Sequence, residues 1–313
     1  MHRREILVSL PLLAAGSVLT PWSALAQVQT PATRWRPSLG LQFFTLAPIA
    51  SGGWDQYSAA MEIAKKIGFD SLELAGLSGY KPDLIRRRAE ELGLGLHSLH
   101  MGNDQQRAFM APGDVGVANA QDAVYTPLGV VQVTRINLPL ARDLGCEWGV
   151  IAASGHSNFA TVDSIRRLCD AFNKSNELAH QIDLKLSYHM HAPDFEPVEG
   201  RMPFEVMIEN TEPSIRYQLD VCWARAGGKD PVELINRYSS RLVSFHLKDL
   251  TKDKKVATPG DGTVDFASIF SASQKVSSPL FYLERDGAPG LDPVQEATRG
   301  YNFLHSLGWG TAA

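Results

Sequence analysis

The chain is poor in cysteine, and the few cysteines that it has are scattered. Its 313 residues include three, Cys146, Cys169 and Cys222, with no Cys-x-x-Cys pair. An odd number at such positions argues against a disulfide framework and predicts buried free thiols. Cys222 comes two residues after Asp220, so its thiol could also face the same side of a strand and approach a metal there.

The chain also lacks an excess of positive charge. It carries 30 Lys and Arg against 34 Asp and Glu, which gives a formal net charge of −4. A surface that binds nucleic acid normally needs a basic patch, so this balance argues against a nucleic acid partner. The composition, 44% hydrophobic and 20% charged, is typical of a globular protein.

Long apolar runs are absent except near the amino terminus, where the run 6–19 is too short for a typical membrane-spanning helix. Two arginines precede this run, and Ala24-Leu25-Ala26 follows it as a cleavage-type motif. Residues 1–26 therefore have the pattern of a secretory signal peptide, and the arginine pair favours the twin-arginine route. Residues 27–37 are expected to form a tether. We expect a periplasmic or secreted protein without stable membrane insertion after cleavage; an uncleaved anchor is the alternative.

Strand-like and helix-like segments alternate eight times along the rest of the chain. The predicted strands are 39–44, 70–74, 94–100, 148–152, 184–190, 215–220, 242–247 and 280–284. The predicted helices are 54–67, 82–92, 131–144, 162–180, 203–209, 231–238, 265–274 and 292–307. Such alternation predicts an α/β fold with parallel strands, and eight units predict a closed (β/α)8 TIM barrel in a single domain. An open nucleotide-binding sheet would need a glycine-rich turn after its first strand, where Thr45-Leu46-Ala47-Pro48 stands instead.

One connection is unusually long. Residues 101–130 follow the third predicted strand and are rich in Gly, Ala, Asp and Gln. A long connection on the side of the barrel that carries catalysis is often functional, so a lid over the site is one interpretation. A plain insertion is the other.

The most informative feature is a set of titratable groups at the ends of four late strands. They end the runs Leu186–His191, Tyr217–Val221, Val243–Asp249 and Phe281–Asp286. Because barrel enzymes place their chemistry at the carboxyl ends of the strands, these groups should meet at one mouth. Mixed imidazole and carboxylate groups suit a divalent transition metal, Mn, Zn, Co or Fe, better than a dedicated calcium site.

These motifs make the chain similar to a known family. It resembles the sugar phosphate isomerase/epimerase family, also called the xylose-isomerase-like TIM barrels, over residues 38–309. The motifs that carry the resemblance are YHMHAPDFEP (188–197), QLDVCWARAGGKDP (218–231), RLVSFHLKDL (241–250), PGDGTVDF (259–266), LERD (283–286) and YNFLHSLGW (301–309).

The resemblance implies a ligand set and a group of catalytic candidates. The implied metal ligands are His189, Asp220, His246 and Glu284, with His191 as an alternative to His189. Many members carry Glu at the first of these positions, so a symmetric mechanism with two metal-bound carboxylates is in doubt here. Glu284 is the expected base, and the candidates for a second catalytic group are His191, Glu196 and Lys248. The expected substrate contacts are Glu73, His100 and Trp223.

These inferences lead to one functional hypothesis and its rivals. We expect an exported, metal-dependent isomerase or epimerase that abstracts a proton next to the metal-bound carbonyl of a sugar or keto-sugar. Loss of a leaving group from the neighbouring carbon would make it a lyase instead. A metal-dependent hydrolase or endonuclease on a related barrel and a non-catalytic carbohydrate-binding barrel are the alternatives.

Overall fold

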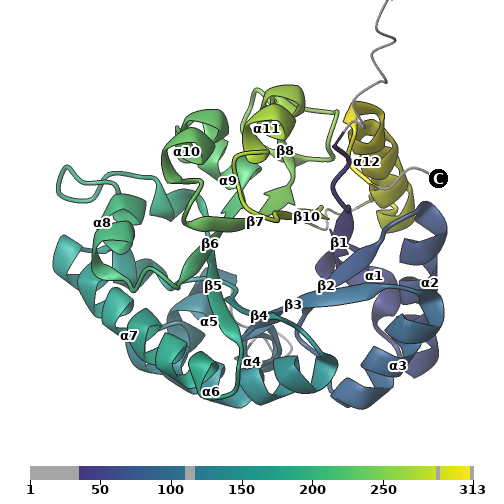
Figure 1. The fold of residues 1–313 in the computed structure, drawn as a ribbon, viewed down its shortest axis with the longest axis horizontal. Helices are drawn as coiled ribbons and strands as arrows, with labels where there is room; N and C mark the ends of the chain where they lie inside the picture. Colours follow the sequence, from purple (N-terminus) through teal and green to yellow (C-terminus); the bar gives the residue numbers. More distant parts are fainter. Residues whose placement is uncertain (1–34, 110–116, 287–289, 311–313) are drawn as a thin grey trace, which may run out of the picture. The chain divides into compact units, whose positions relative to one another are not determined.

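A closed barrel of eight parallel strands forms the centre of the protein (Figure 1). The computed structural model describes residues 35–109, 117–286 and 290–310. The strands are β1 Gly40–Gln42, β2 Ser71–Ala75, β3 Gly95–Met101, β4 Trp148–Ile151, β5 Lys185–His189, β6 Arg216–Asp220, β7 Leu242–Leu247 and β10 Leu280–Leu283. They follow one another around the barrel in chain order, and β1 pairs with β10 to close it. The predicted (β/α)8 barrel is confirmed.

Helices surround the ring of strands (Figure 1). They are α1 Ala47–Ala50, α2 Trp54–Ile67, α3 Pro82–Leu92, α4 Asn103–Phe109, α5 Val117–Val124, α6 Pro127–Leu144, α7 Val162–His180, α8 Pro203–Asn210, α9 Val221–Ala226, α10 Pro231–Tyr238, α11 Phe266–Ser273 and α12 Pro293–Leu307. Four of them, α2, α3, α7 and α10, have the predicted bounds. Local signals explain this agreement: Gly93 ends α3 in the left-handed conformation at φ 62°, and a Thr161–Ser164 capping box begins α7.

The long connection after β3 is more regular than predicted, because it contains the short helices α4 and α5. Asp104 of α4 accepts hydrogen bonds from the backbone N–H groups of Leu77, at 2.6 Å, and Ser78, at 3.1 Å. Asp122 of α5 accepts one from the N–H of Ser157 at 3.1 Å. These bonds tie α4 to the loop after β2 and α5 to the loop after β4. Residues 110–116 of this connection lie outside the described residues.

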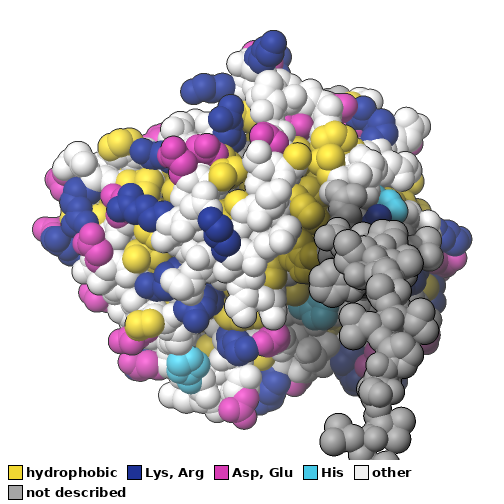
Figure 2. Space-filling view, turned by 45° about the horizontal axis from the view of Figure 1, so that its top comes forward, with side chains coloured by type: hydrophobic (Ala, Val, Ile, Leu, Met, Phe, Trp, Pro, Cys, Tyr) yellow, Lys and Arg dark blue, Asp and Glu magenta, His cyan; other side chains and the backbone are white. Residues whose placement is uncertain are grey.

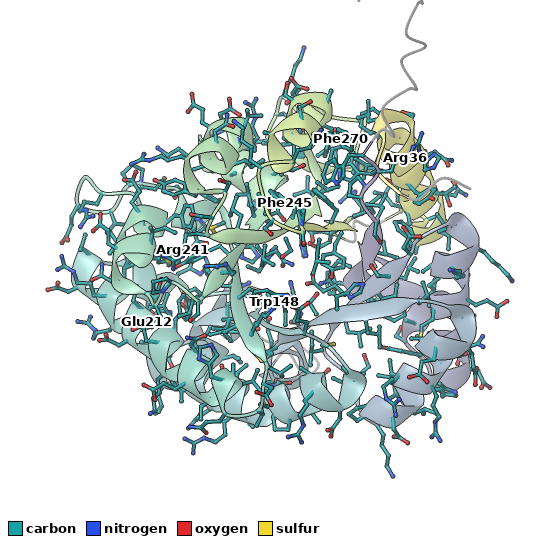
Figure 3. The ribbon with its side chains drawn as sticks, in the orientation of Figure 1. Arg36, Trp148, Glu212, Arg241, Phe245 and Phe270 are labelled. Carbon is teal, nitrogen blue, oxygen red and sulfur yellow. The ribbon has the colours of Figure 1, made fainter. Side chains whose placement is uncertain are left out.

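The barrel interior is apolar at its floor. Trp148 and Val150 of β4 pack there against Val243 and Leu280, and Figure 3 shows Trp148 within the ring of strands. The pairing of β7 with β6 skips Val243, which interrupts the alternation of side chains along β7. Phe245 therefore points to the outer helical layer, on the side opposite to His246, and its ring stacks on Phe281 with centroids 5.1 Å apart. The apolar side chains of the floor fill the barrel on the side away from the carboxyl ends of the strands.

Two sequence-based expectations concern the surface and the cysteines. Basic and acidic side chains are interspersed over the face seen in Figure 2. Among the described residues, no helix has the length and apolar character needed to cross a membrane. The cysteines are buried and unpaired, as predicted. The Cys222 thiol donates to the carbonyl oxygen of Asp249 at 3.2 Å and does not belong to the converging group of candidate metal ligands. The predicted signal peptide, 1–26, lies outside the described residues.

Candidate active site and metal centre

A cavity of about 730 Å³ lies at the carboxyl ends of the barrel strands. The residues from the sequence-based candidates that line it are His100, His189, His191, Trp223, Lys248 and Glu284. Glu196 is exposed and does not line this cavity, so the structure places that candidate away from the site. Phe44, Asn103, Gln121 and Phe159 also line the cavity. They come from separate loops and short helices, which carry no strand-end signal in the sequence.

The four predicted metal ligands converge in space. His189, Asp220, His246 and Glu284 offer ligand atoms that all lie within 4.8 Å of one another, and all four side chains are buried. A second group of three imidazoles joins His100 to His189 and His246. The convergence follows from topology, since β5, β6, β7 and β10 are neighbours in the barrel and run parallel.

Asp220 shows that these residues fit a cation. Its Oδ1 accepts from the backbone N–H groups of Cys222, at 2.9 Å, and Trp223, at 3.0 Å, at the start of α9. Its Oδ2 is buried and has no hydrogen-bond partner among the described residues, although Lys248 Nζ lies 3.2 Å away. Burial raises the pKa of Asp220 to about 6, against the lowering effect of Lys248. A buried carboxylate oxygen left in this state is costly, and coordination of a metal would satisfy it.

Gln218 orients the His189 ring so that one of its nitrogens is free to bind a metal. The amide nitrogen of Gln218 donates to Glu73 Oε1 at 2.9 Å, so its Oε1 is the atom that lies 2.9 Å from His189 Nδ1. Because an amide oxygen only accepts, Nδ1 carries the proton and the lone pair is on Nε2, which lies 4.0 Å from Asp220 Oδ2. Burial and the nearby His246 lower the pKa of His189 well below its usual value. The ring is therefore neutral, as a metal ligand must be.

His246 lies between two carboxylates. Its Nδ1 is 2.6 Å from Glu284 Oε2, and its Nε2 contacts Glu73 Oε2. Burial alone would lower the pKa of His246, but Glu284 and Glu73 raise it to about 9. A cation beside Glu284 would replace the proton on Nδ1, while Glu73 would continue to hold the proton on Nε2. A carboxylate that holds the second nitrogen in this way is typical of metal-binding histidines.

Glu73 lies beneath the cavity rather than at its wall. It is fully buried and accepts from Gln42 Nε2 at 2.9 Å and Ser98 Oγ at 2.6 Å. Burial would raise its pKa, but His100 and His246 hold it well below the usual value, so Glu73 is ionised. This position suits the orientation of the two imidazoles. The sequence suggested that Glu73 contacts substrate directly. The structure does not place it there, because Glu73 is fully buried and does not line the cavity.

Lys248 adds a second positive charge to the site, beside that of His246. Its Nζ lies 2.6 Å from Glu284 Oε2, 3.2 Å from Asp220 Oδ2 and 3.2 Å from Asp286 Oδ1. It also lies 5.6 Å from the centre of the Trp223 ring. Burial would lower the pKa of Lys248, but the three carboxylates raise it well above its usual value. Lys248 is therefore a charged donor and cannot accept a proton.

The turn after β5 fixes the orientation of His191. The His191 ring accepts the backbone N–H of Asp194, and the His191 N–H donates to Asp194 Oδ2 at 2.7 Å. The hydroxyl of Tyr188 also donates to Asp194, at 3.0 Å. Burial and the charge of Lys248 lower the pKa of His191 to about 3, so its ring is neutral. With one ring nitrogen accepting, the other carries the proton. Sequence reasoning missed Asp194; its spacing from His191, typical of a capping box, was the available signal.

The comparison with known proteins assigns the family. Residues 61–307 match the xylose isomerase-like TIM barrel family. The chain belongs to this family. An inosose dehydratase from Geobacillus kaustophilus (strain HTA426) is 28% identical over 242 residues, which cover 66% of this chain and 72% of that protein. For several other relatives of the same name, the chain spans about half of their length.

Several solved structures share the fold. A sugar phosphate isomerase/epimerase from Parabacteroides distasonis ATCC 8503 superposes with a TM-score of 0.72 at 20% identity, covering 86% of this chain and 98% of that one. The IOLI protein, whose structure contains a zinc atom, superposes with a TM-score of 0.61 at 13% identity, covering 86% of this chain and 96% of that one. These likenesses show the barrel fold, and the match over residues 61–307 confirms the resemblance seen in the sequence motifs.

Proposed function

We propose that the chain is a divalent-metal-dependent enzyme that removes a proton from the carbon beside the carbonyl group of a sugar-like ketone. One observation carries the proposal: the four buried ligands His189, Asp220, His246 and Glu284 converge within 4.8 Å at the inner end of a cavity. Family membership and the similarity to an inosose dehydratase support it. Mn, Zn, Co and Fe each suit this donor set.

The residues of the cavity can perform proton abstraction. A divalent cation held by these ligands would polarise the substrate carbonyl and acidify the neighbouring C–H. Glu284 is the base in this scheme. Burial would raise its pKa, but Lys248 and His246 hold the pKa of Glu284 below its usual value, so the carboxylate is ionised and can accept a proton.

We infer that the reaction continues by loss of water, as the name of the Geobacillus relative indicates for that protein. Glu284 takes the proton from carbon, the C–H electron pair forms a C=C bond, and the C–O bond on the next carbon breaks. The charged Lys248 supplies a proton to the departing hydroxyl, and neutral His191 donates a hydrogen bond to it. Proton exchange with solvent then restores Glu284 and Lys248. Return of the proton to carbon would instead give an isomerase or epimerase.

The charges around the cavity favour an uncharged substrate. Lys248 is the only Lys or Arg among the described residues that line it, and three carboxylates already surround its ammonium group. A phosphate group would need an unpaired cation. Trp223 and Phe44 offer apolar ring faces that suit the C–H surface of a sugar or a ring-shaped polyhydroxy ketone.

A substrate panel tests the proposal. Metal-loaded protein is incubated in D₂O with keto-sugars and polyhydroxy cyclohexanones, and NMR follows exchange at the carbon beside the carbonyl and the product formed. Glu284→Gln keeps one ligand oxygen and removes basicity, so turnover should fall about 10²-fold or more. Elimination products support a lyase, and altered stereochemistry supports an epimerase. No exchange with any ketone, or near wild-type turnover by metal-loaded Glu284→Gln, would refute this mechanism.

Metal content provides a separate test of the site. Elemental analysis of purified protein should find one divalent transition metal per chain. Asp220→Ala and His246→Ala should each lose it, because each removes one of the four converging ligands. Full occupancy in both variants would place the metal elsewhere.

We also propose that the enzyme works outside the cytoplasm, in the periplasm or the medium. The support is the signal-type pattern of residues 1–26, in which an apolar run lies between paired arginines and an A-x-A motif. An uncharged sugar-like substrate is compatible with this location.

A further inference from the structure

The ammonium group of Lys248 contacts two of the four candidate metal ligands, Asp220 and Glu284. Glu284 Oε2 lies 2.6 Å from both His246 Nδ1 and Lys248 Nζ. Asp220 Oδ2, which accepts no hydrogen bond from the described part of the chain, lies 3.2 Å from the same ammonium. The ammonium therefore contacts the carboxylate oxygens of both acidic ligands in the group. Its third partner, Asp286, lies outside this ligand group and is partly open to the cavity.

We propose that Lys248 is a built-in counter-cation: it holds the acidic ligands in the metal-free protein, gives them up to the metal, and then pairs with Asp286. This inference rests on the metal site of the proposed function. It adds that the metal affinity is set by a competition between two cations for Asp220 and Glu284, and that Asp286 determines the outcome of that competition.

Electrostatics require such an exchange. Two cations cannot share the same buried oxygens, since like charges a few ångströms apart in a low-dielectric interior repel strongly. Without Lys248 or a metal, Asp220 would be left buried and uncompensated and Glu284 would pair with His246 alone, which also costs free energy. Lys248 removes this cost in the metal-free protein, so the ligand side chains stay in place for the metal.

The structure also provides a place for the displaced ammonium. Asp286 Oδ1 is already 3.2 Å from Lys248 Nζ. Asp286 lines the cavity, and its side chain is 34% exposed. The face of Trp223 lies 5.6 Å from Nζ and stabilises a cation there. The flexible Lys stem lets Nζ move from one set of partners to the other by rotation of the side chain. The ammonium then borders the cavity as a donor to substrate.

Metal titration of four variants tests the inference without a substrate. Calorimetry with ZnCl₂ and with MnCl₂ on chelator-treated full-length protein, at about pH 8 to keep the carboxylates ionised, gives the affinity. Lys248→Met removes the competitor, so metal should bind on the order of tenfold more tightly. Lys248→Gln provides the same test with a polar side chain if the first variant folds poorly. Asp286→Asn removes the alternative partner and should weaken binding several-fold. In the double variant Lys248→Met/Asp286→Asn, the effect of Asp286→Asn should disappear.

Controls separate this inference from the proposed function. Lys252→Met changes the net charge equally at an exposed position and should leave the affinity unchanged. If wild-type protein binds metal but folded Lys248 variants bind it equally or more weakly, the competition is refuted and the metal site remains. An equal loss from Asp286→Asn with and without Lys248 would also refute it. If neither the wild-type protein nor any variant binds either metal, the metal-dependent function itself fails.

Discussion

Gln218 is the residue that connects the polar layer of the barrel to the candidate ligands. Its side-chain oxygen contacts His100 Nε2 at 2.8 Å and His189 Nδ1 at 2.9 Å. Its amide nitrogen donates to Glu73 at 2.9 Å and Ser244 at 3.0 Å. One amide thus sets the orientation of two imidazoles. It lies two residues before Asp220 on β6, so both side chains point into the barrel.

Replacing Gln218 should therefore weaken metal binding and the fold together. Gln218→Met leaves two imidazoles and Glu73 short of a partner, and each unsatisfied buried group costs about 1–3 kcal/mol. Loss of a group that orients a ligand typically weakens metal affinity about 10–100-fold. Calorimetry and urea unfolding measure the two effects. Gln274→Met, at an exposed position, is the matched control. Unchanged metal affinity in Gln218→Met would contradict the orienting role.

Asp194 should make stability depend on pH. Its carboxylate is fully buried and accepts from the hydroxyl of Tyr188 and the backbone N–H of His191, and burial raises its pKa from the usual 3.8 to about 7. Between these values the folded protein holds a proton that the unfolded chain has released. The contribution of Asp194 to stability is therefore fully present below the lower value and is lost as pH rises through the window, at a rate of at most roughly 1.4 kcal/mol per pH unit.

The matched variant isolates this contribution. Asp194→Asn cannot ionise. The difference in unfolding free energy between wild type and variant should therefore change between about pH 4 and about pH 7 and level off at higher pH. Urea unfolding at several pH values measures it. A difference that stays constant over this window would show that Asp194 is ionised throughout.

At the scale of elements, one carboxylate organises the loop between β7 and α11. Asp249 begins a small hairpin, β8 Asp249–Leu250 with β9 Val256–Ala257, which sequence patterns did not predict. The buried side chain of Asp249 accepts from the backbone N–H groups of Gly260, at 3.0 Å, Gly262, at 2.9 Å, and Val264, at 3.0 Å. A Cβ atom on residue 262 would lie 2.3 Å from the Oδ1 atom of Asp249, so glycine is required at this position.

Asp249→Ala should destabilise the protein by several kcal/mol, because it leaves three backbone N–H groups without their acceptor, at about 1–3 kcal/mol each. Asp253→Ala is the control. It lies on the exposed turn of the same hairpin and pairs with Lys255 at 2.9 Å, and exposed ion pairs contribute about 0–1 kcal/mol. Thermal and urea unfolding compare the two. Equal losses would show that the loop does not depend on this carboxylate.

At the scale of the whole molecule, export predicts a shortened chain. If the signal-type pattern is functional, protein isolated from its native host should begin near Gln27, after Ala24-Leu25-Ala26. Intact-mass measurement of the periplasmic or secreted fraction decides this. Changing both arginines at positions 3 and 4 to lysine should retain precursor in the cytoplasm if the twin-arginine route is used. Soluble cytoplasmic protein that keeps residues 1–26 would refute export.

Much of the barrel could be predicted from local signals. Caps, helix-ending glycines and alternating apolar patterns act over a few residues, so the bounds of α2, α3, α7 and α10 and the presence of eight strands could be predicted. The sequence patterns did not predict the short helices α4, α5 and α9 or the hairpin of β8 and β9. Such short segments gain their stability from tertiary contacts, as Asp104 shows by bonding across to Leu77.

The sequence by itself also determined which residue types end the strands, because a parallel barrel brings those ends to one mouth. The convergence of His189, Asp220, His246 and Glu284 follows from that rule together with the family motifs. Only the tertiary structure decided what surrounds them: Gln218 beneath two imidazoles, Glu73 buried rather than open to substrate, Glu196 outside the cavity, and Lys248 among three carboxylates. These relations join strands far apart in the chain, and their distances depend on barrel register and side-chain packing, which local patterns do not encode.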